Sequence, residues 1–172
     1  MSKNAQSTGA ALRQTWERLS TKPGGKTLFS ILLGRMVPYT GSISPRVVEL
    51  RAGYAKVRMK DRHRLRQHLK SVHAIALANL AEVTSGLAMN VGLPDDARGI
   101  VRALSIEYLK KARGVLTAEC QTEIPDTSEK RAHTVHATIT DESGDVVARA
   151  AVEWMVGPAR KPAEQPAPAA TA

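Results

Sequence analysis

The spacing of apolar positions divides the first half of the chain into three helical stretches. Apolar residues recur at helical spacing in residues 10–19 and 26–36, and a Pro- and Gly-containing break at Thr21–Gly25 separates the two. A longer run of small and apolar residues, Val72–Met89, predicts a helix that is buried nearly all the way round. This third helix is therefore expected at the centre of the fold.

Alternation of apolar and polar residues predicts strands on both sides of that helix. Residues 43–50 and 54–60 precede it and read as a hairpin with a tight turn at Arg51–Gly53. Four more strands are predicted after it, at residues 99–108, 115–123, 132–140 and 146–156. The Gly-containing turns at 111–114 and 141–145 indicate antiparallel hairpins rather than crossovers. The pattern predicts an α+β fold, an antiparallel sheet curled around one helix.

The chain of 172 residues suits one main domain with additional ends. We expect an N-terminal helical segment at residues 1–41, the main domain at 42–157, and a disordered Pro- and Ala-rich tail at 158–172. No membrane span is expected, because 28–37 is too short and 72–93 carries several polar residues. No secretory signal is visible at the N-terminus.

Charge and cysteine content bear on the kind of partner and on the redox compartment of the protein. A net charge of +9 and a pI near 10.1 favour an anionic partner: nucleic acid, an anionic membrane or a phosphorylated small molecule. Cys120 is the single cysteine, so no internal disulfide is possible, and a reducing, cytoplasmic location is the expectation. Cys120 alternates with Leu116 and Ala118 and is interpreted as a small core residue.

Glu82 is the only charged residue between Lys70 and Asp95, and it lies within the predicted buried helix. A buried carboxylate costs several kcal/mol unless it is paired, hydrogen-bonded or neutralised. Glu82 is therefore either a functional group or a structural acid bound to backbone amides.

The element order, with the segments Arg66–Ala74, Leu80–Gly86 and Ser105–Gly114, resembles the hotdog fold of acyl-CoA thioesterases. The resemblance spans roughly residues 42–156 and is greatest to the PaaI-like branch, within it to an uncharacterised group with Val-His-Ala at the helix start. It implies hydrolysis of an acyl thioester in a pocket shared between subunits of a homodimer or a dimer of dimers.

The resemblance also implies roles for individual residues. Gln67 stands where PaaI-like enzymes have Asn, His73 at their His, Ala74 and Ile75 at their two Gly, and Glu82 at their acid. Glu82 is then the general base or nucleophile, His73 an orienting or polarising group, and Gln67 a ligand of the carbonyl or of water. Two alternatives stay open. His73 can instead hydrogen-bond a neighbouring backbone carbonyl at the helix start, and Gln67 can be a loop residue in solvent.

Further residues are candidates for substrate binding. The Ala74 N–H, at the positive end of the helix, is a candidate oxyanion donor. Asn79 is a candidate either for the acyl pocket or for capping a buried polar network, and Ser85 is a candidate for substrate binding. Arg62 and Arg64 are candidates for the phosphates of coenzyme A. The same basic run, from Lys56 to Lys70, can equally be the solvated face of an outer strand.

The sequence thus favours an acyl-CoA thioesterase, with a non-catalytic acyl-CoA- or lipid-binding hotdog protein as the alternative. Nucleic-acid binding is less favoured, because base stacking needs exposed aromatic side chains and the chain has only one Phe, three Tyr and two Trp. The histidine spacing does not suggest a metal site. No cofactor is expected beyond coenzyme A as part of the substrate.

Overall fold

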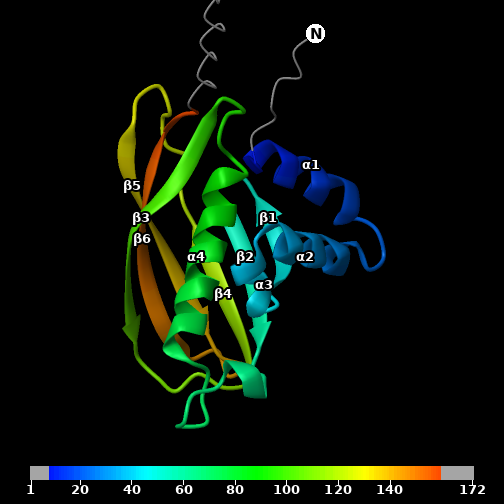
Figure 1. The fold of residues 1–172 in the computed structure, drawn as a ribbon, viewed down its shortest axis with the longest axis vertical. Helices are drawn as coiled ribbons and strands as arrows, with labels where there is room; N and C mark the ends of the chain where they lie inside the picture. Colours follow the sequence, from blue (N-terminus) through cyan, green and yellow to red (C-terminus); the bar gives the residue numbers. More distant parts are fainter. Residues whose placement is uncertain (1–7, 160–172) are drawn as a thin grey trace, which may run out of the picture.

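The computed structural model describes residues 8–159, and its elements follow the predicted order (Figure 1). Three helices come first, α1 (Thr8–Leu19), α2 (Gly25–Met36) and α3 (Pro38–Ser42), followed by the strands β1 (Arg46–Arg51) and β2 (Tyr54–Lys60). A short 3-10 turn, η1 (His63–Leu65), leads to the long helix α4 (Ala74–Asn90). The last four strands are β3 (Ala97–Tyr108), β4 (Val115–Gln121), β5 (Arg131–Thr140) and β6 (Val146–Pro158).

The six strands form one sheet in the order β1-β2-β4-β5-β6-β3, and every pair is antiparallel. The sheet curls around α4, which packs against all of its strands (Figure 1). The predicted α+β architecture is therefore confirmed. The buried side chains of the sheet and of α4 form one continuous core together with those of the N-terminal helices.

Two local predictions are wrong. Residues 43–45 are not strand, because Ile43 caps α3, Ser44 has a positive φ of 49° and Pro45 precedes β1. The turn at 111–114 does not close a hairpin, because β3 pairs with β6 whereas β4 pairs with β2 and β5. Gly114 does have the predicted positive φ of 73°, but the turn carries the chain across the sheet.

The N-terminal helices cover the part of α4 that the sheet leaves open. A Cβ on Gly9 would lie 2.1 Å from the Asn90 carbonyl oxygen, so a glycine is needed where α1 crosses the end of α4. The Arg13 guanidinium donates to the Val91 carbonyl at 2.9 Å and pairs with Asp95. The apolar character of α4 on nearly every side is thus explained by cover from two directions.

The ends of the chain refine the predicted boundaries. β6 continues through Pro158, which pairs with Ala97, so the first residue of the predicted tail belongs to the sheet. The rest of that predicted tail, from Arg160 onward, lies outside the described residues. Within residues 8–159, no helix is both long and apolar enough to cross a lipid bilayer.

Candidate functional site

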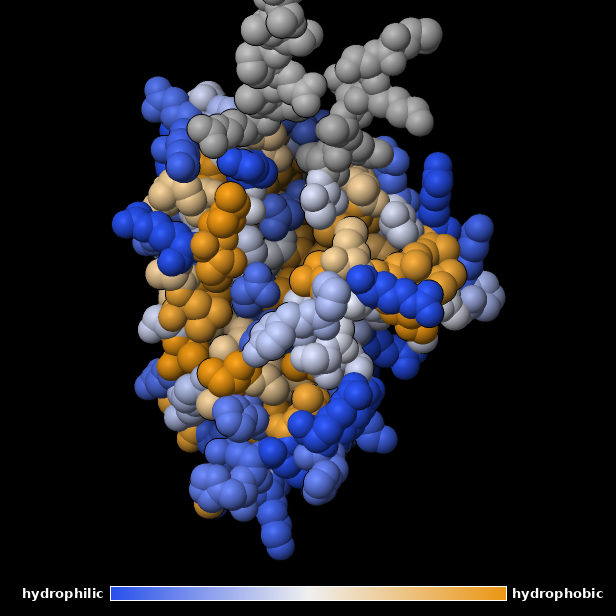
Figure 2. All heavy atoms as spheres, viewed as in Figure 1, coloured by the Kyte–Doolittle hydropathy of each residue, from blue (hydrophilic) through white to orange (hydrophobic). Residues whose placement is uncertain are grey.

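A cleft of about 430 Å³ lies over α4, between the N-terminal helices and the ends of β3 and β6 (Figure 2). Its size falls in the range of small-molecule sites, about 300–1,000 Å³. Its apolar lining includes Leu12, Leu33, Val37, Val83 and Trp154.

Glu82 lines this cleft from the middle of α4. Burial raises the pKa of its carboxyl above the ordinary glutamate value, because desolvation disfavours the charged form. No hydrogen bond or ion pair joins this carboxylate to any other residue in the range 8–159. The other carboxylate at the cleft, Asp95, is exposed and paired with Arg13. Glu82 is thus the one lining carboxylate that is both partly desolvated and without a charge partner among the described residues.

The floor of the cleft depends on a contact between α4 and β6. The Trp154 indole N–H donates to Ser85 Oγ at 3.3 Å, and that hydroxyl donates to the Glu82 carbonyl at 2.9 Å. Ser85 is fully buried, so its hydroxyl positions Trp154 beneath the cleft and does not line it. Gly86 makes room for the indole, since a Cβ there would lie 2.8 Å from Trp154 Cη2.

His73 is the N-cap of α4, with extended backbone angles. Its Nδ1 accepts the Ile75 N–H at 3.1 Å, which places the ring proton on Nε2 in the neutral form. The backbone N–H of His73 donates to the Leu65 carbonyl at 2.7 Å. Among the hydrogen bonds of residues 8–159, none uses the Ala74 N–H, which lies at the positive end of the helix. The start of α4 therefore presents a donor pair, Ala74 N–H and His73 Nε2–H.

The structure does not bring His73 and Glu82 together within one chain. Nine residues separate them, which along a helix is about 13 Å and about two and a half turns, so they lie on opposite sides of α4. Gln67 stays with the His73 end, where its side-chain amide donates to Ser71 Oγ at 3.0 Å and its N–H to the Ser71 carbonyl. One chain thus presents two half-sites, the start of α4 and the Glu82 cleft.

The remaining predicted substrate-binding residues lie outside the cleft. Asn79 is buried and donates to the Tyr39 carbonyl at 3.2 Å, which fastens α3 to α4. Arg62 and Arg64 are exposed on the segment that leads to α4, and Arg64 donates to Ser44 Oγ at 2.8 Å. Neither lines the Glu82 cleft, and Arg62 lines surface pockets together with Ser44 and Arg46.

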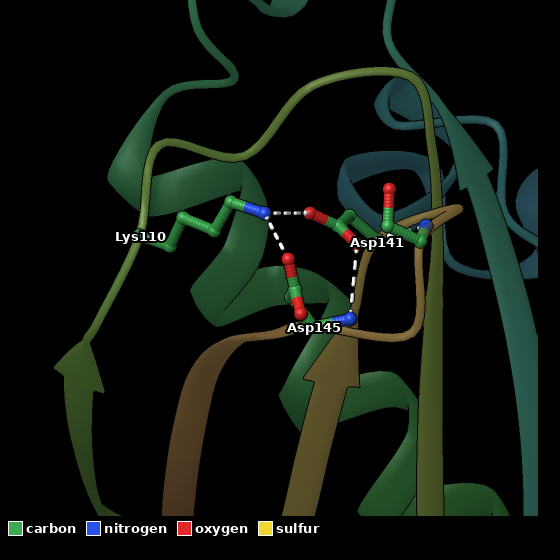
Figure 3. A network of polar contacts seen from close by, with 4 residues as sticks. Lys110, Asp141 and Asp145 are labelled. Atoms are coloured by element: carbon green, nitrogen blue, oxygen red, sulfur yellow. Dashed lines mark hydrogen bonds and ion pairs between the residues drawn. The ribbon is translucent and has the colours of Figure 1, made fainter.

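The end of β3 is fixed beside the start of α4. The Tyr108 hydroxyl donates to the Ala74 carbonyl at 3.1 Å. Two residues further on, the Lys110 ammonium lies between the carboxylates of Asp141 and Asp145 in the β5–β6 turn (Figure 3). Asp141 Oδ1 also accepts the N–H groups of Ser143 and Asp145, and the Lys110 contact lowers the pKa of the Asp141 carboxyl. These contacts hold β3, the turn and the helix start in one arrangement.

Sequence reasoning missed most of the cleft. Leu12 and Leu33 fall in predicted helices, Trp154 falls in a predicted strand and Val37 follows a predicted helix, but their convergence depends on how distant elements pack. Gly86 carried the one usable signal: a glycine inside a helix costs about 1 kcal/mol relative to alanine and needs a packing reason.

Comparison with known proteins gives a consistent assignment of the fold. The family model described as "Domain of unknown function (DUF4442)" matches residues 25–156. No curated protein sequence matches the chain. The crystal structure of the structural-genomics target APC5556 is 31% identical, with a TM-score of 0.75, and covers 89% of this chain and 100% of its own.

Two further crystal structures share the fold. PA5026 from Pseudomonas aeruginosa, described as a "Probable Thioesterase", is 22% identical over 77% of this chain and 95% of its own, with a TM-score of 0.69. A thioesterase family protein from Silicibacter pomeroyi is 15% identical over 75% of this chain and 96% of its own, with a TM-score of 0.65. At these identities the similarity concerns the fold, and the predicted hotdog fold is confirmed.

Proposed function

The chain belongs to the family described as Domain of unknown function (DUF4442), and from that premise we propose that it hydrolyses an acyl thioester at the Glu82 cleft. One observation carries the proposal: a partly buried carboxylate with a raised pKa and no charge partner among the described residues lies in an otherwise largely apolar cleft. The fold shared with thioesterase family proteins supports the substrate class.

Glu82 acts as the general base in this proposal. Its carboxylate takes a proton from water while the water oxygen forms a bond to the thioester carbonyl carbon. The carbon–sulfur bond then breaks, and the thiolate that leaves takes up a proton to give the free thiol. A raised pKa makes Glu82 a stronger base near neutral pH than an exposed glutamate.

The negative charge on the carbonyl oxygen needs donors, and the donor pair at the start of α4 lies away from the Glu82 of the same chain. We propose that a second copy supplies them through the Ala74 N–H and His73 Nε2–H at the start of its own α4. The opposite placement of His73 and Glu82 on one helix supports this arrangement. Arg62 and Arg64, exposed on the segment that leads to α4, are proposed to bind the phosphates of coenzyme A.

The cleft holds the acyl chain in this proposal. Leu12, Leu33 and Val37 line it from the N-terminal helices, Val83 lines it from α4, and Trp154 forms its floor. Removing an acyl chain from water between such walls contributes about 25 cal/mol per Å² of buried apolar surface.

Hydrolysis of a panel of acyl-CoAs of different chain length tests the proposal, with the released thiol as readout. Glu82→Gln keeps the shape of the side chain and removes the base, so turnover should fall by about 10²- to 10⁴-fold. Glu49→Gln is the matched control, because Glu49 is exposed on β1. Undiminished hydrolysis by Glu82→Gln would remove Glu82 from the mechanism.

A second candidate function is non-catalytic binding of an acyl thioester or lipid. The isolation of Glu82 from His73 and Gln67 within one chain favours it, because a single chain has a binding cleft but no complete catalytic set. Saturable binding of acyl-CoA without thiol release by the wild-type protein would establish this function in place of hydrolysis.

A further inference from the structure

Helix α2 has two apolar faces, and only one of them is used by the core. Phe29 and Leu33 are buried against the rest of the fold. On the other side, Leu28, Ile31, Leu32 and Met36 share a face at helical spacing and are 47%, 48%, 40% and 50% exposed. The exposed apolar surface continues past the end of the helix at Val37 (41%) and Tyr39 (68%). We refer to these six side chains as the α2–α3 surface.

Cationic side chains border the α2–α3 surface. Ile31 shares a surface pocket with Arg35, Arg46 and Arg62, and an adjoining pocket that also contains Arg46 and Arg62 adds Lys26, Arg58 and Lys60. In Figure 2, hydrophobic side chains gather over α2 at the right of the view and hydrophilic ones border them. An exposed apolar patch with one side rimmed by cations is the pattern of an interaction site.

Few acidic residues lie near these cations in the sequence. From Arg18 to Val48 the sequence contains no Asp or Glu. None of the cations lining the two pockets forms an ion pair within residues 8–159, and Lys26 donates instead to the Val48 carbonyl at 2.8 Å. The surface is therefore both apolar and locally positive.

We propose that the α2–α3 surface docks this protein onto an anionic lipid bilayer. Leu28, Leu32 and Met36 enter the boundary between headgroups and acyl chains, and the bordering cations contact anionic headgroups. Arg35 lies within the apolar face, where its aliphatic stem follows the surface while the guanidinium reaches the headgroup level.

Charge complementarity selects the bilayer over other occupants. A second copy in a two-fold contact would set this patch against itself and bring its arginines close to one another. A nucleic acid would match the cations but would leave the exposed Leu, Ile and Met side chains without apolar contacts. An anionic bilayer satisfies both components of the surface.

The docking surface adjoins the cleft. Val37 belongs to the exposed apolar set and also lines the Glu82 cleft, and Leu33, on the buried side of the same helix, lines it too. Docking through α2–α3 therefore sets one wall of the cleft beside the bilayer. The docking proposal does not depend on hydrolysis, and its test uses binding alone.

Co-sedimentation of the full-length protein with vesicles tests the proposal. We expect binding to vesicles of phosphatidylcholine mixed with phosphatidylglycerol, little binding to phosphatidylcholine alone, and weaker binding as salt rises. Leu28→Ser/Leu32→Ser should weaken binding by at least about tenfold, because two leucines that the bound protein partly buries in the bilayer are lost. Arg35→Gln/Arg46→Gln should weaken it by about 25-fold, since each cation near an anionic surface adds about a factor of five.

Matched controls separate this surface from general effects of charge and apolarity. Lys111→Gln/Lys130→Gln removes two exposed cations elsewhere, and Leu69→Ser removes a leucine that is 48% exposed outside the patch. Both controls should bind like the wild type. The side chains at all altered positions are exposed. The circular dichroism spectra and melting temperatures of the variants should therefore match those of the wild type.

Three results would overturn the proposal. One is equal binding by the wild type and both patch variants. Another is a lower oligomeric mass in the leucine variant without any loss of vesicle binding, which would assign the surface to a second copy. The third is salt-sensitive binding of the wild type to duplex or single-stranded nucleic acid with none to anionic vesicles.

Discussion

Gly86 and Trp154 occupy a shared space between α4 and β6. A Cβ at position 86 would lie 2.8 Å from Cη2 and 3.0 Å from Cζ2 of the indole, closer than atoms pack without displacement. The glycine thus allows Trp154 to lie under the cleft with its N–H on Ser85. The position of the cleft floor depends on this pair.

Gly86→Ala should therefore displace the Trp154 ring. We expect a packing penalty of about 1–3 kcal/mol, offset in part by the gain of about 1 kcal/mol from replacing glycine within a helix. Chemical denaturation measures the net effect. In a Trp154→Leu background the clash is removed, so Gly86→Ala should become neutral or stabilising. An equal effect in the two backgrounds would show that the residues are not coupled.

The raised pKa of Glu82 predicts the pH dependence of hydrolysis. Only the deprotonated carboxylate accepts a proton from water, so kcat/KM should rise with pH through a midpoint above the ordinary glutamate pKa of about 4.3. Stopped or continuous thiol assays across this range measure the midpoint. A midpoint at the ordinary glutamate value would contradict desolvation of Glu82 as the cause of the pH limb.

The same shift predicts how stability changes with pH. The unfolded chain releases the Glu82 proton at a lower pH than the folded chain, so stability is highest below the ordinary glutamate pKa and falls as pH rises through the raised one. The Glu82→Gln side chain does not ionise, so the variant does not lose stability in this way as pH rises. The variant should therefore gain stability relative to wild type as pH rises above the ordinary glutamate pKa of about 4.3. A variant that is less stable throughout, by about 1–3 kcal/mol, would indicate a structural glutamate with buried donors.

The edge strand β3 predicts self-association. It is paired on one side only, with β6, and it exposes Ile100 at 54%. A second copy that pairs with this edge would continue the sheet. Light scattering should give at least a dimeric mass at micromolar concentration, and Ile100→Lys should lower it. A monomeric wild type would contradict this prediction.

Complementation tests whether two copies share one site. Glu82→Gln and His73→Ala are each expected to be inactive alone, because each removes one half-site. Co-expressed as a mixed dimer, they should regain activity, since one of the two shared sites then keeps both its wild-type His73 and its wild-type Glu82. Mixed protein as inactive as the two parents would contradict a site shared between two copies. The mixture of Glu49→Gln and His73→Ala, in which both chains keep Glu82 and one keeps His73, serves as a reference for the activity of such mixed proteins.

What the sequence determined by itself is mainly local. Helical and strand periodicities located each main element to within a few residues, because a buried face repeats at the period of its own element. The lone charge at Glu82 also identified the group that now lies in the cleft, because a carboxylate among apolar residues is informative wherever the helix packs. The nine-residue spacing from His73 to Glu82 could also be read from the sequence.

The tertiary structure decided how distant segments combine. The sequence predicted a hairpin at Lys111–Gly114, but β3 pairs with β6, because strand partners are chosen by which pairing buries the shared core and not by the nearest turn. Leu12, Leu33 and Trp154 meet at one cleft only after α1, α2 and β6 have packed on α4. No periodicity within a single segment encodes that convergence, since it depends on contacts between residues far apart in the chain.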